Sequence, residues 1–186
     1  MKTMSFASAK EFRSWLVKHH SSSEGILLRI YKKDCGVAAV TYAEALDQAL
    51  CFGWIDGQKS PYDSKSWLQK FTPRRPKGGW SKNNTQHVER LIESGDMTAA
   101  GLKEVNAAKE DGRWKAAYES SSMAKIPDDL LKALASNKSA QAFFKTLNRA
   151  NLYSITYRLQ TAKKPEIREK RMRAIVEKLA RGEKFH

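Results

Sequence analysis

The sequence predicts an α+β protein, with a small N-terminal sheet of about three strands packed with helices and an all-helical C-terminal region after it. Three observations predict this class. Short apolar, partly β-branched runs lie within the first 72 residues. Apolar residues at helical spacing alternate with these runs and continue alone from Pro127 onward. The order helix, strand, helix, strand, strand is typical of helices packed on one sheet.

Two helices and one strand are predicted before the first tryptophan-rich segment. The helices cover residues 8–20 and 42–51, and the strand covers residues 25–31. Ser8 with Glu11, and Thr41 with Glu44, form capping-box patterns, in which a hydroxyl and a carboxylate satisfy backbone donors at a helix start. The strand run, GILLRIY, is short, apolar and partly β-branched.

A β-hairpin is predicted next, from strands at residues 52–59 and 66–72. The Ser-Pro-Tyr-Asp-Ser sequence between them is typical of a turn. Pro73 and Pro76, together with the Gly78-Gly79 pair, then end the second strand and predict an exposed loop.

Two more helices and a domain boundary follow the loop. Ser81 is the expected N-cap of a helix that ends at Gly95, and Thr98 caps another that ends at Gly112. The serine triplet at 120–122 marks the boundary. The predicted domains are residues 1–120, an α+β core with a basic Trp/Arg loop, and residues 126–186, a helical region.

The C-terminal region is predicted to be helical throughout because its apolar residues recur at helical spacing. The stripes are Leu130, Leu131 and Leu134; Phe143, Phe144 and Leu147; and Leu152, Ile155 and Leu159. Pro165 fits the first turn of a last helix, where its missing N–H is not needed.

Composition restricts the classes of function. The net charge of +14 favours anionic partners, which include nucleic acid, an anionic membrane surface, and phosphorylated or carboxylated small molecules. The two cysteines form no C-x-x-C pair and are expected to be reduced thiols. No secretory signal and no run of about 18 apolar residues is seen, so we expect a cytoplasmic protein without membrane insertion.

The motifs of common enzymes and cofactor proteins are missing from the sequence. It contains no phosphate-cradling glycine loop, no histidine pair at metal-ligand spacing and no nucleophile elbow. We therefore assign no catalytic residue, no metal ligand and no cofactor. The missing motifs favour a protein that is not an enzyme, while residues distant in the sequence can still form a catalytic site.

The segment between Asp63 and Glu89 carries positive charge without any acidic residue. Its basic residues are Lys65, Lys70, Arg74, Arg75, Lys77 and Lys82. The two adjacent arginines lie between prolines, and each guanidinium can hold a carboxylate or phosphate in a bidentate way. Trp80 and the helix start at Ser81 follow, and helix N-termini attract anions. An anion-binding cleft is one reading; a solvated basic loop anchored by Trp80 is the other.

The Phe-Gly-Trp-Ile-Asp-Gly run at 52–57 adds a second set of candidates. Gly53 permits close approach of a ligand or another backbone. Asp56 is a candidate general base, or a partner for one of the arginines at the end of the hairpin. The alternative is a turn or bulge, with Trp54 in the core. The predicted ligand-binding residues are Trp54, Asp56, Arg74, Arg75, Trp80, Ser81 and Lys82.

The last helix is the third basic feature. Its cations are Lys163, Lys164, Arg168, Lys170, Arg171, Arg173, Lys178, Arg181 and Lys184. Acidic residues oppose them at the favourable i, i+4 spacing, as in Glu166–Lys170, Glu169–Arg173 and Glu177–Arg181. This pattern favours a self-paired, solvated face. A nucleic-acid-binding helix and a helix on an anionic membrane are the alternatives.

Several motifs resemble the bacterial YdeI/OmpD-associated family, also called bacteriocin-protection proteins. In chain order the motifs are Glu44-Ala45-Leu46-Asp47, Cys51-Phe52-Gly53-Trp54-Ile55-Asp56-Gly57, Phe71-Thr72-Pro73-Arg74-Arg75, Trp80-Ser81-Lys82-Asn83, Gly112-Arg113-Trp114, Tyr157, Lys163-Lys164-Pro165-Glu166, Arg171 and Gly182. The resemblance extends along nearly the whole chain. It implies a role in stress and antimicrobial-peptide resistance, an association with an outer-membrane porin, and no defined reaction or cofactor.

Three hypotheses follow. The first is a non-enzymatic, cytoplasmic stress-tolerance protein whose cleft binds an anionic or phosphate-containing small molecule. The second is a nucleic-acid-binding protein, suggested by the charge of +14. The third is an enzyme that acts on an anionic small molecule through Asp56, which then has to line a concave pocket.

Overall fold

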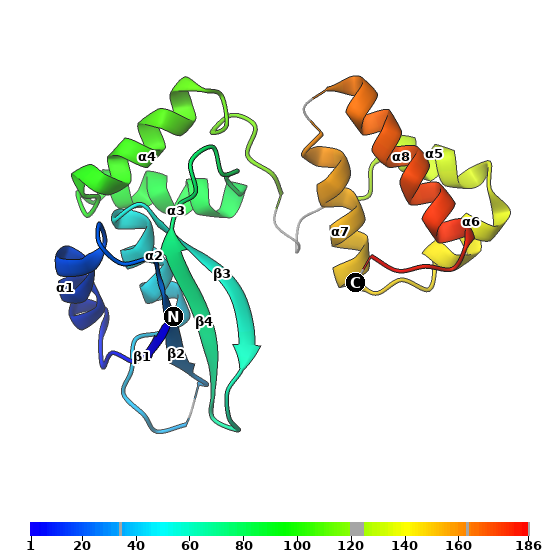
Figure 1. Cartoon of the computed structure of the whole chain (residues 1–186). Helices are drawn as coiled ribbons and strands as arrows, with labels where there is room; N and C mark the ends of the chain where they lie inside the picture. Colours follow the sequence, from blue (N-terminus) through cyan, green and yellow to red (C-terminus); the bar gives the residue numbers. More distant parts are fainter. Residues whose placement is uncertain (34, 120–124, 163, 186) are drawn as a thin grey trace. The chain divides into compact units, whose positions relative to one another are not determined.

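The computed structural model describes residues 1–33, 35–119, 125–162 and 164–185. The chain forms two compact units, Met1–Ala117 and Tyr118–His186, each with its own hydrophobic core (Figure 1). The predicted α+β class, with a helical C-terminal region, is confirmed. The serine triplet that was predicted to mark a boundary lies outside the described residues, as does Lys163 of the basic last helix.

The first unit holds the sheet and four helices. Its elements are β1 (Lys2–Met4), α1 (Ala9–His19), β2 (Ile26–Tyr31), α2 (Tyr42–Cys51), β3 (Trp54–Pro61), β4 (Ser66–Pro73), α3 (Lys82–Glu93) and α4 (Ala99–Glu110). The second unit is helical. Its elements are α5 (Asp128–Ala135), α6 (Lys138–Phe144), α7 (Arg149–Gln160) and α8 (Pro165–Ala180).

The sheet has the strand order β1-β2-β4-β3. The predicted hairpin is the antiparallel β3–β4 pair, and β2 pairs antiparallel with the other edge of β4. The short strand β1 was not predicted. It is parallel to β2, with Lys2 opposite Ile26. Three residues are too few for an alternating pattern, and β1 is defined by its pairing with a distant strand.

The helix starts follow the predicted caps, with one difference. At α2 the capping box is complete, because the Thr41 N–H donates to Glu44 Oε2 at 2.9 Å and the Glu44 N–H donates to Thr41 Oγ1 at 3.3 Å. The Thr41 N–H and the Thr41 hydroxyl both donate to Glu44 Oε2, and these two hydrogen bonds lower the pKa of the Glu44 carboxyl. At α1, Ser8 accepts from the Glu11 N–H, but Glu11 accepts from Ala7, one residue before the cap.

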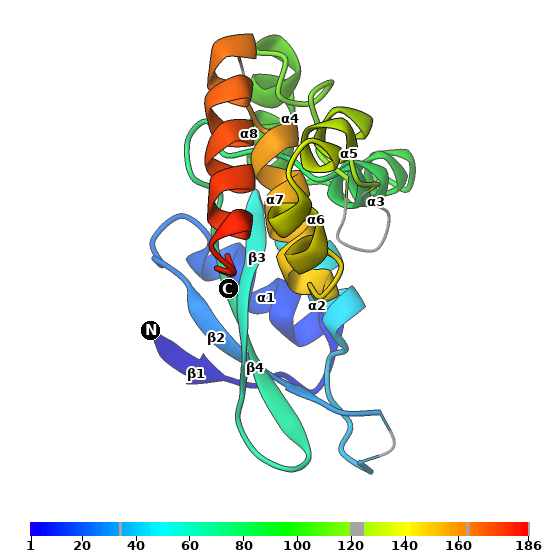
Figure 2. The ribbon, with the colours of Figure 1, turned by 90° about the vertical axis from the view of Figure 1, so that its right-hand side faces the viewer.

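One face of the sheet packs against α1 and α2, which lie together on one side of it (Figure 2). Along β2, Ile26, Leu28 and Ile30 are buried in this core, while the residues between them are partly exposed. Trp54 is completely buried; its indole N–H donates to the His20 carbonyl at 3.0 Å, and its ring meets Trp15 edge to face. Both cysteines are free thiols.

The second unit has a separate core, whose buried members include Leu130, Leu134, Ile155 and Ile175. Leu131, predicted to belong to the same stripe, is 46% exposed, because the adjacent positions on α5 already supply the buried face. Within the described residues, no helix is both long and apolar enough to cross a membrane.

The predicted charge pairs of the last helix are found in part. Glu169 and Arg173 approach to 3.7 Å. Arg181 pairs with Glu183 at 2.8 Å instead of with Glu177, because Glu183 lies just past the helix end, within reach of the guanidinium.

Candidate anion-binding site

The end of the β3–β4 hairpin and the loop that follows it line a half-open cavity of about 340 Å³, here called the hairpin cavity. The residues that line it are Ile55, Asp56, Gly57, Gln58, Lys70, Thr72, Pro73, Arg74, Arg75, Gly78 and Gly79. All belong to the first unit. The structure thus brings Asp56 and both arginines of the predicted site to one cavity.

Arg74 forms a fixed wall of the hairpin cavity. Its guanidinium carbon lies 3.3 Å from the centroid of the Trp80 ring, and its Nη1 donates to the Gly79 carbonyl at 3.3 Å. Trp80 is only 2% exposed and packs against Trp114, with 4.9 Å between ring centroids. A guanidinium stacked on a buried indole is pre-positioned.

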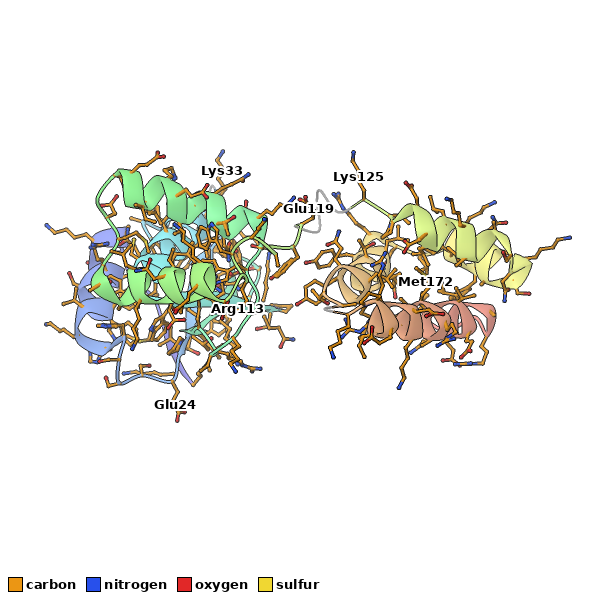
Figure 3. The ribbon with its side chains drawn as sticks, turned by 90° about the horizontal axis from the view of Figure 1, so that it is seen from above. Glu24, Lys33, Arg113, Glu119, Lys125 and Met172 are labelled. Carbon is orange, nitrogen blue, oxygen red and sulfur yellow. The ribbon has the colours of Figure 1, made fainter. Side chains whose placement is uncertain are left out.

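The loop itself is held by backbone contacts. The Gly78 N–H donates to the Arg75 carbonyl at 2.9 Å, which closes a tight turn. Lys77 within this turn has a φ of 61°, in the left-handed region. Arg113, labelled in Figure 3, donates from Nη1 to the Gly78 carbonyl at 2.8 Å and holds the loop from outside the hairpin.

Lys70 and Arg75 supply positive charge to the cavity. Among the residues that the structure describes, neither side chain takes part in a hydrogen bond, an ion pair or a ring contact. Thr72, two residues after Lys70 on β4, faces the same side of the sheet and adds a hydroxyl. Two cations that have no partner among the described residues, in a shared concave site, are suited to hold an anion.

Asp56 faces the opposite way. It lies opposite Phe71 in the β3–β4 register, and Phe71 is buried in the core with α1 and α2. Its Oδ2 accepts a hydrogen bond from the Tyr42 hydroxyl at 2.8 Å. Burial, and then the neighbouring Asp56 carboxylate, raise the pKa of Tyr42 above its usual value, so the hydroxyl remains a donor. The structure gives Asp56 this tyrosine as its side-chain partner, in place of the expected arginine.

The remaining predicted residues lie outside the cavity lining. Trp54 is in the core, and Trp80 lies beneath Arg74. Ser81 is the N-cap of α3, where its Oγ accepts from the Asn84 N–H at 3.2 Å, and Lys82 is the first residue of that helix.

Sequence reasoning did not include Lys70, Thr72 or Tyr42 in the site. The first two could have been predicted, because alternate residues of a strand share a face of the sheet. Lys70 and Thr72 are alternate residues at the end of β4 that leads into the arginine loop. Tyr42 had no such signal, because its contact with Asp56 depends on how α2 packs on β3.

A second, larger cavity of about 630 Å³ lies between β2, the start of α2 and the segment that joins them. Its lining is mostly apolar, with Ile30, Val37, Val40 and Trp67 among the residues. Lys32 belongs to the same lining, but its amine donates to the Ser64 carbonyl at 2.7 Å. No cluster of side chains suited to a metal ion occurs in the described part of the chain.

Comparison with known families divides the chain as the two units do. A family model described as "Domain of unknown function (DUF8412)" matches residues 4–104. Another, described as "Bacteriocin-protection, YdeI or OmpD-Associated", matches residues 123–182. The resemblance drawn from the sequence is thus confirmed for the second region, whereas most of the N-terminal motifs lie in the first. No curated protein and no solved structure gives a match.

Proposed function

We propose that this chain, which belongs to the family described as Domain of unknown function (DUF8412), binds a small phosphate- or carboxylate-bearing molecule through its N-terminal unit. The unit binds this molecule without transforming it. The ligand occupies the hairpin cavity. Its negative charge is neutralised by Lys70 and Arg75, and Arg74 with the loop glycines forms the wall.

The observation that carries this proposal is the pair of cations in the hairpin cavity without partners among the described residues. Side chains that only solvate a protein surface are usually exposed or self-paired, as are those of α8. Lys70 is half-buried and Arg75 is exposed, and both border a cavity of about 340 Å³, within the usual size range of small-molecule sites. Asp56 also lines the cavity, but its carboxylate accepts a hydrogen bond from Tyr42 and forms no ion pair with either cation among the described residues.

The C-terminal region suggests the cellular role. Residues 123–182 match the bacteriocin-protection family, and on this basis we propose that the whole chain protects bacteria against bacteriocins. Anion binding by the first unit is then its molecular activity. Replacement of the native protein by a Lys70→Ala/Arg75→Ala variant is expected to lower the survival of bacteria exposed to a bacteriocin.

Titration of the ¹⁵N-labelled full chain with inorganic phosphate tests the binding directly. The expected result is saturable shifts of the amide signals of Arg75, Gly78 and Gly79, at constant ionic strength. The Lys70→Ala/Arg75→Ala variant should lose these shifts, because both charges are removed.

Lys77→Asn is the matched control for the titration. It removes a positive charge from the same loop, asparagine tolerates the left-handed backbone of this position, and Lys77 is not part of the cavity lining. Binding should persist in this variant. Equal loss in Lys77→Asn, or shifts that chloride reproduces, would mean that the loop attracts anions only through its overall charge, and the proposal would then fail.

A further inference from the structure

We propose that the side of the sheet opposite α1 and α2 binds a single-stranded nucleic acid, with one of its phosphates in the hairpin cavity. We call this side the open face. The inference rests on the anion site of the proposed function, but here the bound phosphate belongs to a polynucleotide and not to a small molecule. The open face is formed by Leu27, Arg29 and Tyr31 of β2 and by Leu68, Lys70 and Thr72 of β4.

The strand register places these side chains together. Leu27 is opposite Lys70, and Arg29 is opposite Leu68, so each pair projects to the same side of the sheet. The intervening residues of β2 are buried against α1 and α2, which makes this the other side. All six side chains are partly exposed.

Aromatic rings stand at the end of the open face near the hairpin turn. The guanidinium carbon of Arg29 lies 4.5 Å from the ring centroid of Tyr31 and 4.9 Å from that of Tyr62. Tyr62 is 52% exposed. Stacked tyrosine and arginine groups of this kind are platforms for unpaired bases, because every base has a π-face.

The charge of the open face complements a phosphate backbone. Its nearby carboxylate, Asp63, is already engaged, with Arg29 at 2.6 Å and with the Ser66 hydroxyl at 2.8 Å. Lys70 and Arg75 have no such partner among the described residues. A duplex buries its base faces, so aromatic platforms beside a cationic cavity favour a single strand.

The length of β4 sets the size of the site. Its eight residues span about 23 Å between the aromatic end and the cavity end, at about 3.3 Å per residue. At about 3.4 Å per nucleotide, the spacing of one strand in a duplex, roughly seven nucleotides cover this length, and a more extended single strand needs fewer. Oligonucleotides of ten nucleotides should therefore reach both ends.

Fluorescence anisotropy of the full chain with labelled single-stranded RNA and DNA decamers tests the inference. Tyr62→Ala is expected to weaken binding by roughly five- to a hundredfold through loss of stacking. Lys70→Ala/Arg75→Ala should make the slope of log affinity against log salt shallower by about 0.7, the value for the one phosphate of a single strand that the cavity holds. Tyr157→Ala, at another partly exposed tyrosine, is the matched control and should bind normally.

Several results would overturn the inference. The first is that the decamers do not bind at low salt, and the second is that a duplex binds with the same affinity as a single strand. The third is that Tyr157→Ala weakens binding as much as Tyr62→Ala does. The fourth is that the protein binds anionic lipid vesicles and not the decamers. If inorganic phosphate still binds in the cavity, the proposed function stands and only its extension to a polynucleotide fails. If phosphate does not bind either, both are wrong.

Discussion

At the scale of single residues, the sequence predicts that Asp56 and the two adjacent arginines form one site, but the structure directs their side chains to different partners. Asp56 and the Arg74-Arg75 pair meet the same cavity, but Asp56 directs its carboxylate to Tyr42. The alternation of side chains along β3 decides this, because Asp56 shares the core-facing side with Trp54. Residue types alone predicted the candidates; which cations stay without partners depends on the packed structure.

Because of the hydrogen bond between Tyr42 and Asp56, the free energy of unfolding should fall as the pH becomes alkaline. Tyr42→Phe should lower the free energy of unfolding by about 1 kcal/mol at pH 7, through loss of one hydrogen bond. Because folding raises the pKa of Tyr42, its contribution is complete below the ordinary tyrosine pKa of about 10 and is lost as pH rises above it. The difference in free energy of unfolding between wild type and variant should therefore become smaller above pH 10. Urea denaturation followed by tryptophan fluorescence measures this difference at each pH. A difference that stays constant would contradict the Tyr42–Asp56 hydrogen bond as its source.

At the scale of elements, glycine permits the close contact between α4 and the end of α2. A Cβ on Gly101 would overlap the Cys51 carbonyl oxygen, which already accepts hydrogen bonds from the Thr98 N–H and hydroxyl. The sequence predicts the N-cap at Thr98, because capping is local. It does not predict that this cap also contacts α2, since that contact joins residues 47 positions apart.

Gly101→Ala should accordingly destabilise the protein, although alanine favours helices by about 1 kcal/mol over glycine. The overlap with backbone atoms of α2 is expected to cost more than this gain, for a net loss of about 1 to 3 kcal/mol. Gly95→Ala is the comparison. Its φ is 76° with no atom within 4 Å of the added Cβ, so only backbone strain of about 1 to 2 kcal/mol applies. A Gly101→Ala protein as stable as wild type would show that the two helices separate without cost.

At the scale of the whole molecule, the two units differ in what their sequences reveal. The helical repeat of the second unit is local, and apolar spacing predicts its helices, although Leu147 of the second predicted stripe lies beyond the end of α6. In the first unit the hairpin was predictable from its turn, whereas β1 and the strand order depend on pairing between distant segments. The hairpin cavity also depends on such pairing, because its lining residues come from β3, from β4 and from the loop after β4.

Two separate cores predict two unfolding transitions. All five tryptophans lie in the first unit, so tryptophan fluorescence reports its unfolding, while circular dichroism at 222 nm reports the helices of both units. The two probes should give non-coincident denaturation curves.

Arg168→Ala assigns the transitions. Arg168 donates to Asp129 on α5 at 2.7 Å and to the Leu159 carbonyl of α7 at 2.7 Å, so its loss removes contacts that join three helices of the second unit. We expect a cost of about 1 kcal/mol in the part of the dichroism curve that tryptophan fluorescence does not follow, which is the unfolding of the second unit. Arg173→Ala on the same helix removes only a 3.7 Å pair whose side chains are more than two-thirds exposed, and should change little. Coincident curves that Arg168→Ala shifts equally would show instead that the two units unfold as one cooperative body, because a local change would then be felt by both probes.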